Sequence, residues 1–266
     1  MYRSPPQDAG MLSRTRRWSV VGTSSSQRSP STPEWERVRE LFRAGNPDPD
    51  AVSRGIADAL SPQVRSEMSG PGVAACLDTM LETVVGGGEA LAREVGPLGG
   101  RSLAALARTV AERRIARAGA ASRLADIALD ALGASVVETL ATSVASLALS
   151  HVSPKGVTED DVTEAARCFM RHDMSRCFSY FVSRDLSELV GTPVLPDVDA
   201  ARRLVRGVSD HCRRAVDRVE PVGAGDLLPA YLEPARSGRG PLLSGVLEQM
   251  VRDSLDAIAT GTGEDR

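Results

Sequence analysis

Five histidine and cysteine side chains in the second half of the chain have the chemistry to hold a zinc ion. Cys168, His172 and Cys177 form one group, and His211 and Cys212 form another. On a helix Cys168 and His172 share a face, whereas Cys177 lies about 900° further round and points the opposite way. His211 and Cys212 are adjacent and also diverge. Structural zinc sites use tight paired spacings such as C-x2-C. The spacing therefore predicts no metal site and favours buried, small apolar roles for the cysteines.

No other motif supplies a catalytic site. The glycines Gly86, Gly87 and Gly88 lack the Gly-Lys-Ser/Thr ending of a phosphate-binding loop and follow no strand, so they predict the end of a helix. His151 has no serine and acid at a spacing that would assemble a triad. The acidic run 159–161 fits the first turn of a helix, where the helix dipole favours negative charge. The sequence predicts a protein that is not an enzyme and carries no cofactor.

A basic stripe is the main candidate binding surface. It consists of Arg108, Arg113, Arg114, Arg117 and Arg123. Such a stripe can meet nucleic-acid phosphates or an acidic partner, and it can equally be a solvated helix face. The chain has 32 Lys and Arg against 35 Asp and Glu residues, for a net charge of −3. This balance excludes a general polyanion binder and favours the solvated face. Nucleic-acid binding stays as the alternative function.

Residues 1–31 predict a disordered tail. They contain five arginines and one aspartate, a net charge of +4, among Ser, Pro, Thr and Gly, with no apolar periodicity. Residues 15–21 resemble a twin-arginine export signal, but the polar stretch that follows them lacks the apolar region such a signal needs. Val21 fits a GTG start codon of a high-GC bacterial gene. One interpretation is that residues 1–21 are a removed leader, and another is that they are the product of a start placed too far upstream; both expose Gly22 as the first residue. The residues of this segment by themselves favour a third interpretation, an ordinary tail.

From residue 32 to 259 the apolar residues repeat with helical spacing. Thr32-Pro33 and Asp48-Pro49 predict helix starts, and a third helix is expected over 71–85. Residues 101–150 form the strongest helical block. A break at 151–157 leaves open whether the domain consists of two halves. Thr158 with Asp161 predicts the next start, followed by two helices up to 190.

The remaining segments complete an all-α prediction. A helix starting after Asp197 and two shorter ones around 225–235 and 241–259 are expected, and 260–266 should be disordered. The longest uncharged run, 139–154, is shorter than the roughly 20 residues that cross a bilayer, so no membrane association is expected. Four cysteines in so long a chain favour a reducing cytoplasm.

Several short segments together resemble QatB-like proteins of the Qat anti-phage defence system. The resemblance rests on 22–26 (Gly-Thr-Ser-Ser-Ser), on 85–88 (Val-Gly-Gly-Gly) and on 153–161 (Ser-Pro-Lys-Gly-Val-Thr-Glu-Asp-Asp). It implies a non-catalytic component that accompanies an ATPase, a QueC-like enzyme and a TatD-like nuclease. It further implies that the QueC-like partner joins a 7-deazaguanine group to an N-terminal glycine, which here would be Gly22, with Thr23 and Ser24 as recognition residues.

The chemistry of an N-terminal amine suits that role. With a pKa near 7.8 against about 10.4 for a lysine, about 14% of an α-amine but only about 0.04% of a lysine amine is the free base at pH 7. Glycine places no side chain beside this amine, and a flexible tether would let it enter an active site while the helical body docks elsewhere.

Overall fold

The computed structural model describes residues 32–43, 45, 47–96, 102–142, 156–186, 189–233 and 239–261. Most of these residues lie in α-helices, and apart from one isolated bridge between Val190 and Leu195 they contain no strand. The all-α prediction is confirmed. The tail at 1–31 and residues 262–266 lie outside the described residues.

The first three helices each begin at a proline that follows a capping side chain. They are α1 (Pro33–Arg43), α2 (Pro49–Ala59) and α3 (Pro62–Met68). Thr32 Oγ1 accepts from the Trp35 amide at 3.4 Å, and Asp48 accepts from the Ala51 amide at 3.1 Å. Proline suits the first helical position because its missing N–H would have no helical partner there. The starts of α1 and α2 were predicted, whereas α3 was not.

Helix α4 (Pro71–Val95) starts where expected but does not end at the triple glycine. Gly87 leaves the helical conformation with φ 60° and ψ −160°, and the chain then resumes a helix up to Val95. The prediction of a helix end was therefore only half right: the glycines allow a kink, because this backbone conformation is essentially restricted to glycine.

The block at 101–150 divides into two helices, α5 (Leu103–Ala118) and α6 (Arg123–Thr142). Gly119 ends α5 in the left-handed conformation (φ 62°). Arg123 consequently belongs to a different helix from the rest of the basic stripe. Residues 143–155 lie outside the described residues. Of the break predicted at 151–157, only positions 156 and 157 are described.

The second part of the chain contains the longest helix, α7 (Glu159–Leu186). Its start is confirmed: the Thr158 amide donates to Asp161 Oδ2 at 2.8 Å, and the Asp161 amide donates back to Thr158 Oγ1 at 3.2 Å. The two helices expected up to 190 form a single helix instead. After it come α8 (Val198–Val216), the 3-10 turn η3 (Gly225–Leu227), α9 (Leu228–Leu232) and α10 (Arg239–Thr260).

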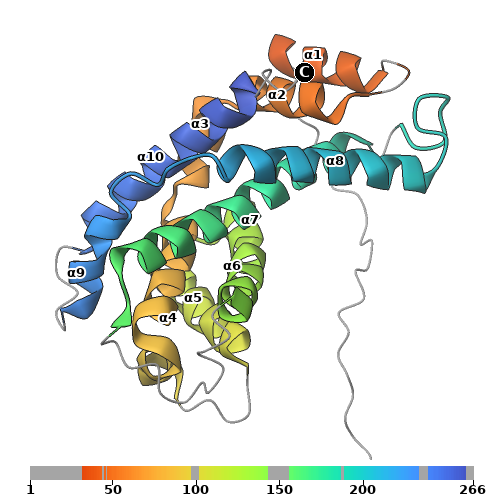
Figure 1. Ribbon diagram of the computed structural model, residues 1–266. Helices are drawn as coiled ribbons and strands as arrows, with labels where there is room; N and C mark the ends of the chain where they lie inside the picture. The colour runs from red at the N-terminus through yellow and green to blue at the C-terminus, as the bar shows by residue number, and fades with distance from the viewer. Residues whose placement is uncertain are drawn as a thin grey trace, which may run out of the picture.

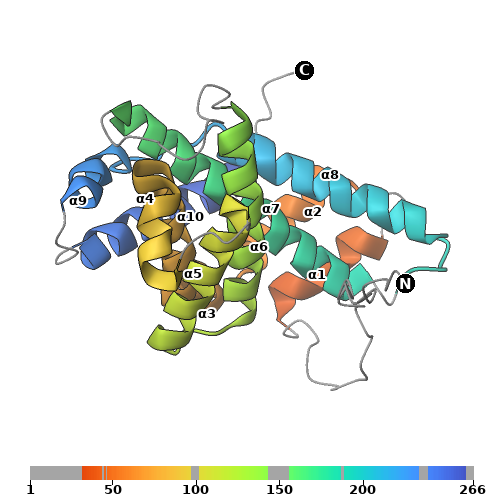
Figure 2. The ribbon, with the colours of Figure 1, turned by 90° about the horizontal axis from the view of Figure 1, so that it is seen from below.

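Helix α7 runs through the middle of the molecule (Figures 1 and 2). It packs against α6 and α4 on one side and against α8 on the other, and α4, α5 and α6 pack on one another. Helices α1 and α2 cover the end where α7 finishes, and α10 packs on α2 and α8. The buried side chains from Trp35 to Ile258 form one continuous apolar cluster that includes residues on both sides of the 151–157 segment. Among the described helices, none combines the length and the apolar character needed to cross a bilayer.

Candidate functional site

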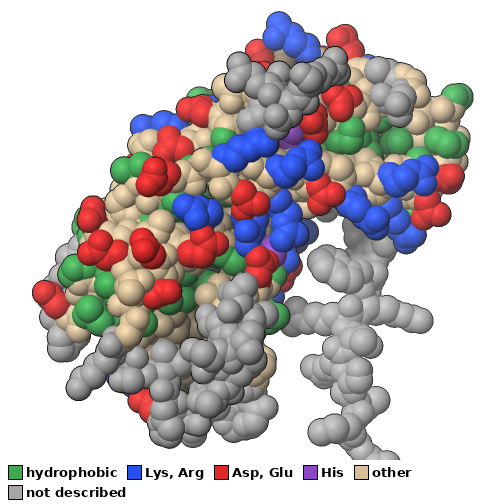
Figure 3. Space-filling view, in the orientation of Figure 1, with side chains coloured by type: hydrophobic (Ala, Val, Ile, Leu, Met, Phe, Trp, Pro, Cys, Tyr) green, Lys and Arg blue, Asp and Glu red, His purple; other side chains and the backbone are tan. Residues whose placement is uncertain are grey.

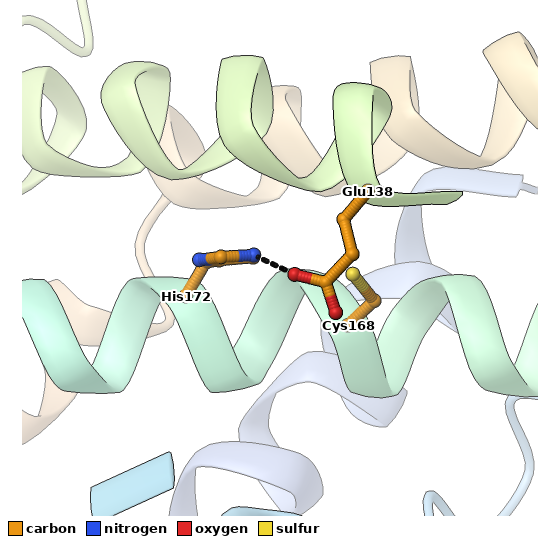
Figure 4. Close-up of side chains that lie close together, drawn as sticks. All are labelled: Glu138, Cys168 and His172. Atoms are coloured by element: carbon orange, nitrogen blue, oxygen red, sulfur yellow. Dashed lines mark hydrogen bonds and ion pairs between the residues drawn. The ribbon is translucent and has the colours of Figure 1, made fainter. Parts of the chain in front are cut away.

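The junction of α6, α7 and α8 holds the most concentrated set of chemically versatile side chains. Glu138 on α6 points towards Cys168 and His172 on α7 (Figure 4). One donor atom from each of these three residues lies within 4.8 Å of the other two. Because Cys168 and His172 are four residues apart on α7, they share a helix face, as the sequence predicted. Glu138 is the residue that sequence reasoning missed. Its signal was available, because it is the only charged residue between Asp130 and Lys155.

The hydrogen bonds of His172 define its protonation state. Arg176 Nη1 lies 3.0 Å from His172 Nδ1, and a guanidinium can only donate, so Nδ1 is the accepting nitrogen. The proton is therefore on Nε2, which donates to Glu138 Oε2 at 2.7 Å. Burial lowers the pKa of His172, and the positive charge of Arg176 acts in the same direction against the opposing effect of Glu138. His172 is neutral at pH 7.

An arginine occupies the centre of this cluster. Arg171 Nη2 contacts Glu138 Oε1 and lies 3.6 Å from Cys168 Sγ, while Arg171 Nη1 donates to Asp217 Oδ1 at 2.9 Å. A metal ion bound to the three donors would have to displace this guanidinium. It would also have to remove the proton from His172 Nε2 and from the Cys168 thiol, whose pKa is raised by burial. The residues present therefore do not fit a metal ion, which needs a ring nitrogen that carries no proton and a thiolate, whereas Nε2 of His172 carries the proton and the Cys168 thiol is protonated.

The same contacts argue against a nucleophilic cysteine. In such a site the histidine base faces the thiol and a third group orients the histidine. Here both ring nitrogens of His172 are engaged elsewhere, and the Cys168 thiol donates to the Ser135 carbonyl oxygen at 3.9 Å. The cluster is a polar joint that holds three helices together. Charge-assisted hydrogen bonds of this kind are strong because both partners are ionised.

A second unusual group lies on the neighbouring position of α7. Asp173 is completely buried, and neither of its carboxylate oxygens has a hydrogen-bond partner among the described residues. Burial raises the pKa of Asp173 to about 7, against the opposing effect of the positive charge of Arg176. A carboxyl group in such surroundings changes protonation near neutral pH.

The predicted basic stripe divides into surface and buried members. Arg108 is half-exposed and pairs with Glu112 at 3.0 Å and with Asp130 at 2.6 Å. Arg113 donates to the Glu94 carbonyl oxygen at 2.9 Å, and Arg117 is 66% exposed, 3.7 Å from Glu94. Much of the charge that sequence inspection assigned to this face is thus offset by carboxylates.

Arg114, the remaining member of the stripe on α5, is a buried structural hub. Its side chain is 11% exposed and pairs with Asp78, Glu82 and Glu94. Glu82 precedes the kink at Gly87 and Glu94 follows it, so Arg114 joins the two parts of α4 to α5. Burial alone would lower the pKa of Arg114, but the hydrogen bond to Glu94 and the charges of Asp78 and Glu82 together raise it.

One groove among the described residues, of about 750 Å³, lies between α4, α5 and α10, and Asp78, Arg114 and Arg239 lie in its wall. The Asp78 carboxylate offsets part of the positive charge of the two arginines, because it lies 3.1 Å from Arg239 Nε and 2.6 Å from Arg114 Nη1. A second groove, of about 530 Å³, lies between α7 and α8. Its arginines are described below.

The other predicted site residues divide between described and undescribed parts of the chain. Gly22, Thr23 and Ser24 lie outside the described residues. All four cysteines (Cys76, Cys168, Cys177 and Cys212) are buried free thiols, as expected. His211 Nδ1 lies 2.9 Å from Asp50 Oδ1, and His211 Nε2 lies 3.3 Å from the Ile258 carbonyl oxygen. Neither partner belongs to the His172 cluster.

Comparisons with protein-family models, with curated proteins and with solved structures each found no match to this chain. The interpretation of function therefore depends on the residues themselves.

Proposed function

We propose that this protein is a non-catalytic component of a bacterial anti-phage defence system. In this proposal the helical body is a docking scaffold and Gly22 accepts a 7-deazaguanine-type group from a QueC-like partner. An ATPase and a TatD-like nuclease of the same system would be its other partners, and the cytoplasm its location. The observation that carries the proposal is the Gly-Thr-Ser segment at 22–24, placed shortly before a firmly packed first helix.

The first helix supplies a fixed base for that segment. Trp35 on α1 is 4% exposed, its ring lies 6.3 Å from that of Phe181, and the Arg184 guanidinium lies over it at 5.3 Å. Gly22 lies ten positions before Thr32 in the chain. An extended chain spans at most roughly 3.3–3.6 Å per residue, so the amine would reach no more than about 35 Å from the start of α1. A partner active site would have to open within that distance of a docked scaffold.

The amines of the chain narrow the possible acceptors. Lys155 is the only lysine, so an amine-directed modification has two candidate sites, the N-terminal amine and Lys155. In the proposed step a carboxylate oxygen of the 7-deazaguanine group attacks the α-phosphorus of ATP, which forms an acyl adenylate (a mixed anhydride) and releases pyrophosphate; AMP is then the leaving group. The amine nitrogen attacks the carbonyl carbon, and a C–N bond forms as the C–O bond to the phosphate-bearing leaving group breaks. The nitrogen then loses a proton to leave an amide.

Peptide mapping by mass spectrometry tests this proposal on protein purified from cells that carry its native gene neighbourhood. We expect a mass increase on the peptide that begins at Gly22. Gly22→Val should abolish the modification and phage protection, whereas Lys155→Arg should leave both intact. An unmodified chain that begins at Met1, or a mass increase located on Lys155, would refute the proposal. So would a gene neighbourhood that lacks the QueC-like, ATPase and TatD-like genes.

A further inference from the structure

The groove between α7 and α8 has an apolar floor that no described element covers. It is lined by aliphatic side chains from the end of α7, the following turn and the start of α8: Leu186, Val190, Val198, Ala201 and Val205. Val190 is 37% exposed and Val198 is 54% exposed, which is high for valine. The groove's volume of about 530 Å³ falls within the range of sites that accommodate apolar groups.

Arginines flank this apolar floor. Arg202 and Arg206 on α8 both line the groove. Arg202 pairs with Asp199 at 3.1 Å, but both side chains are more than 70% exposed, so this pair is weak. Among the described residues, no carboxylate lies within 4.0 Å of Arg206. Figure 3 shows basic side chains gathered along α8, with hydrophobic side chains beside them.

The basic character continues along the same two helices towards the His172 cluster. On α7, Arg176 precedes the groove residues Ser179 and Ser183 by three and seven positions, and this spacing places the three on one helix face. On α8, Arg213 follows the groove residue Ser209 by four positions. Arg176 is half-buried and donates only to the ring and carbonyl oxygen of His172, with no carboxylate of the described chain within 4.0 Å.

Exposed guanidinium groups beside an apolar floor fit one kind of occupant best. We propose that this groove binds an amphipathic helix of a partner protein, with aliphatic side chains on the floor and acidic side chains against Arg202 and Arg206. Helices bind such grooves through anchors at i, i+3 or i+4, and i+7. Carboxylates supply the bidentate partners that guanidinium groups prefer. The chain's own residues 1–31 carry five arginines and one aspartate, so they have the wrong charge for this groove.

This inference rests on the scaffold role in the proposed function and identifies where the scaffold would dock. It does not involve Gly22, and the two are tested separately. A chain with Gly22→Val should bind the groove probe as the unsubstituted protein does. Loss of modification with intact groove binding would refute only the modification, and the reverse result would refute only the groove.

The probe is a fluorescently labelled synthetic helix of about 18 residues, with leucines at i, i+4 and i+7 and glutamates along both edges of the leucine stripe. Its binding to the full-length protein is followed by fluorescence anisotropy. Two control probes are a peptide with the same leucines and arginines in place of glutamates, and a DNA duplex. We expect saturable one-to-one binding of the acidic peptide, and binding of the arginine peptide and of DNA that is at least about ten-fold weaker.

Surface variants locate the binding site. Val198→Asp and Arg206→Glu should each weaken binding of the acidic peptide by about ten-fold or more. Both residues are exposed, so these changes should leave the fold intact, which far-ultraviolet circular dichroism checks. The matched controls are Val222→Asp, at a valine that is 65% exposed away from the groove, and Arg252→Glu on the exposed side of α10. Both should leave the affinity within about two-fold.

Four results would overturn the proposal. They are no binding of the acidic peptide at millimolar concentration, equal loss of binding in the groove and control variants, tighter binding of the arginine peptide, and tighter binding of the DNA. The last result would point to nucleic acid as the occupant. A concentration-dependent dimer that Val198→Asp dissociates would point to a second copy of this chain and would also overturn it.

Discussion

The effect of Asp173→Asn on the free energy of unfolding should depend on pH. Measured against the unsubstituted protein, the substitution should be more favourable near pH 8 than near pH 4. Asp173 is fully buried without a hydrogen-bond partner among the described residues, and its pKa is raised from 3.8 to about 7. Between these values the folded state holds a proton on Asp173 that the unfolded state has released. Folding therefore takes up a proton, and the free energy of unfolding falls as the pH rises through this window.

The size of the effect follows from the two pKa values. Each unit of difference corresponds to about 1.4 kcal/mol, so the buried charge costs about 4 kcal/mol once the pH exceeds 7. Asparagine has a similar shape and no charge, and it removes this term. Its amide group also lacks partners, which costs roughly 1–3 kcal/mol at every pH. The difference between the two proteins should therefore be zero or unfavourable near pH 4 and should rise by about 4 kcal/mol up to pH 8.

Urea denaturation followed by circular dichroism, repeated across this pH range, measures the difference directly. Other groups titrate in both proteins and largely cancel. Asp126→Asn is the matched control, because that side chain is 67% exposed, and it should change stability by less than about 0.5 kcal/mol at each pH. If the free energies of unfolding of Asp173→Asn and of the unsubstituted protein changed in parallel with pH, the surroundings of Asp173 would not disfavour its charged form.

Three further predictions concern Arg114, the kink at Gly87 and the Glu138 cluster. Arg114→Ala removes the guanidinium that three largely buried carboxylates share and should cost about 3–5 kcal/mol in urea denaturation. Arg117→Ala should cost less than about 1 kcal/mol, and equal costs for the two substitutions would contradict the structural role of Arg114. Gly87→Ala should cost about 1–3 kcal/mol at its strained kink, while Gly133→Ala within α6, where an added Cβ meets nothing within 4 Å, should stabilise by up to about 1 kcal/mol. If thermal unfolding showed that Gly87→Ala and Gly133→Ala shift the melting temperature in the same direction, the strained kink at Gly87 would be refuted. Equimolar zinc should leave the melting temperature unchanged in the unsubstituted protein and in Cys168→Ser; a rise that Cys168→Ser removes would show that the Glu138 cluster does hold a metal ion.

The sequence predicts those parts of the fold that depend on neighbouring residues. The starts of α1, α2 and α7 follow from Thr32, Asp48 and Thr158, whose side chains cap the next turn. Such caps act within three or four residues, so they can be recognised without knowledge of the tertiary structure. The kink at Gly87 shows the limit of this reasoning. The glycines permit either an end or a kink, and the contacts of Arg114 with both parts of α4 are not visible in the sequence.

The undivided length of α7 could not be predicted for a different reason. A helix on the surface shows one apolar stripe, but α7 packs on several sides against α4, α6 and α8. Its middle therefore mixes apolar residues with His172, Asp173 and Arg176, and this mixture resembles a break between two helices. Only the partners on other helices, such as Glu138, explain how polar residues are accommodated there.

Counting charges in the sequence does not identify which arginines are available at the surface. Of the 32 Lys and Arg residues, only Lys155 is a lysine, so nearly every cation is a guanidinium, which can bind several carboxylates at once. Arg114 and Arg171 are used in this way and hold helices together. A stripe of arginines in the sequence therefore says little about surface charge until each carboxylate has been assigned. Within the described chain, Arg206 has no carboxylate within 4.0 Å, and it lines the groove with the apolar floor between α7 and α8. The search for a partner should therefore begin at that groove, ahead of the face that carries Arg108 and Arg117.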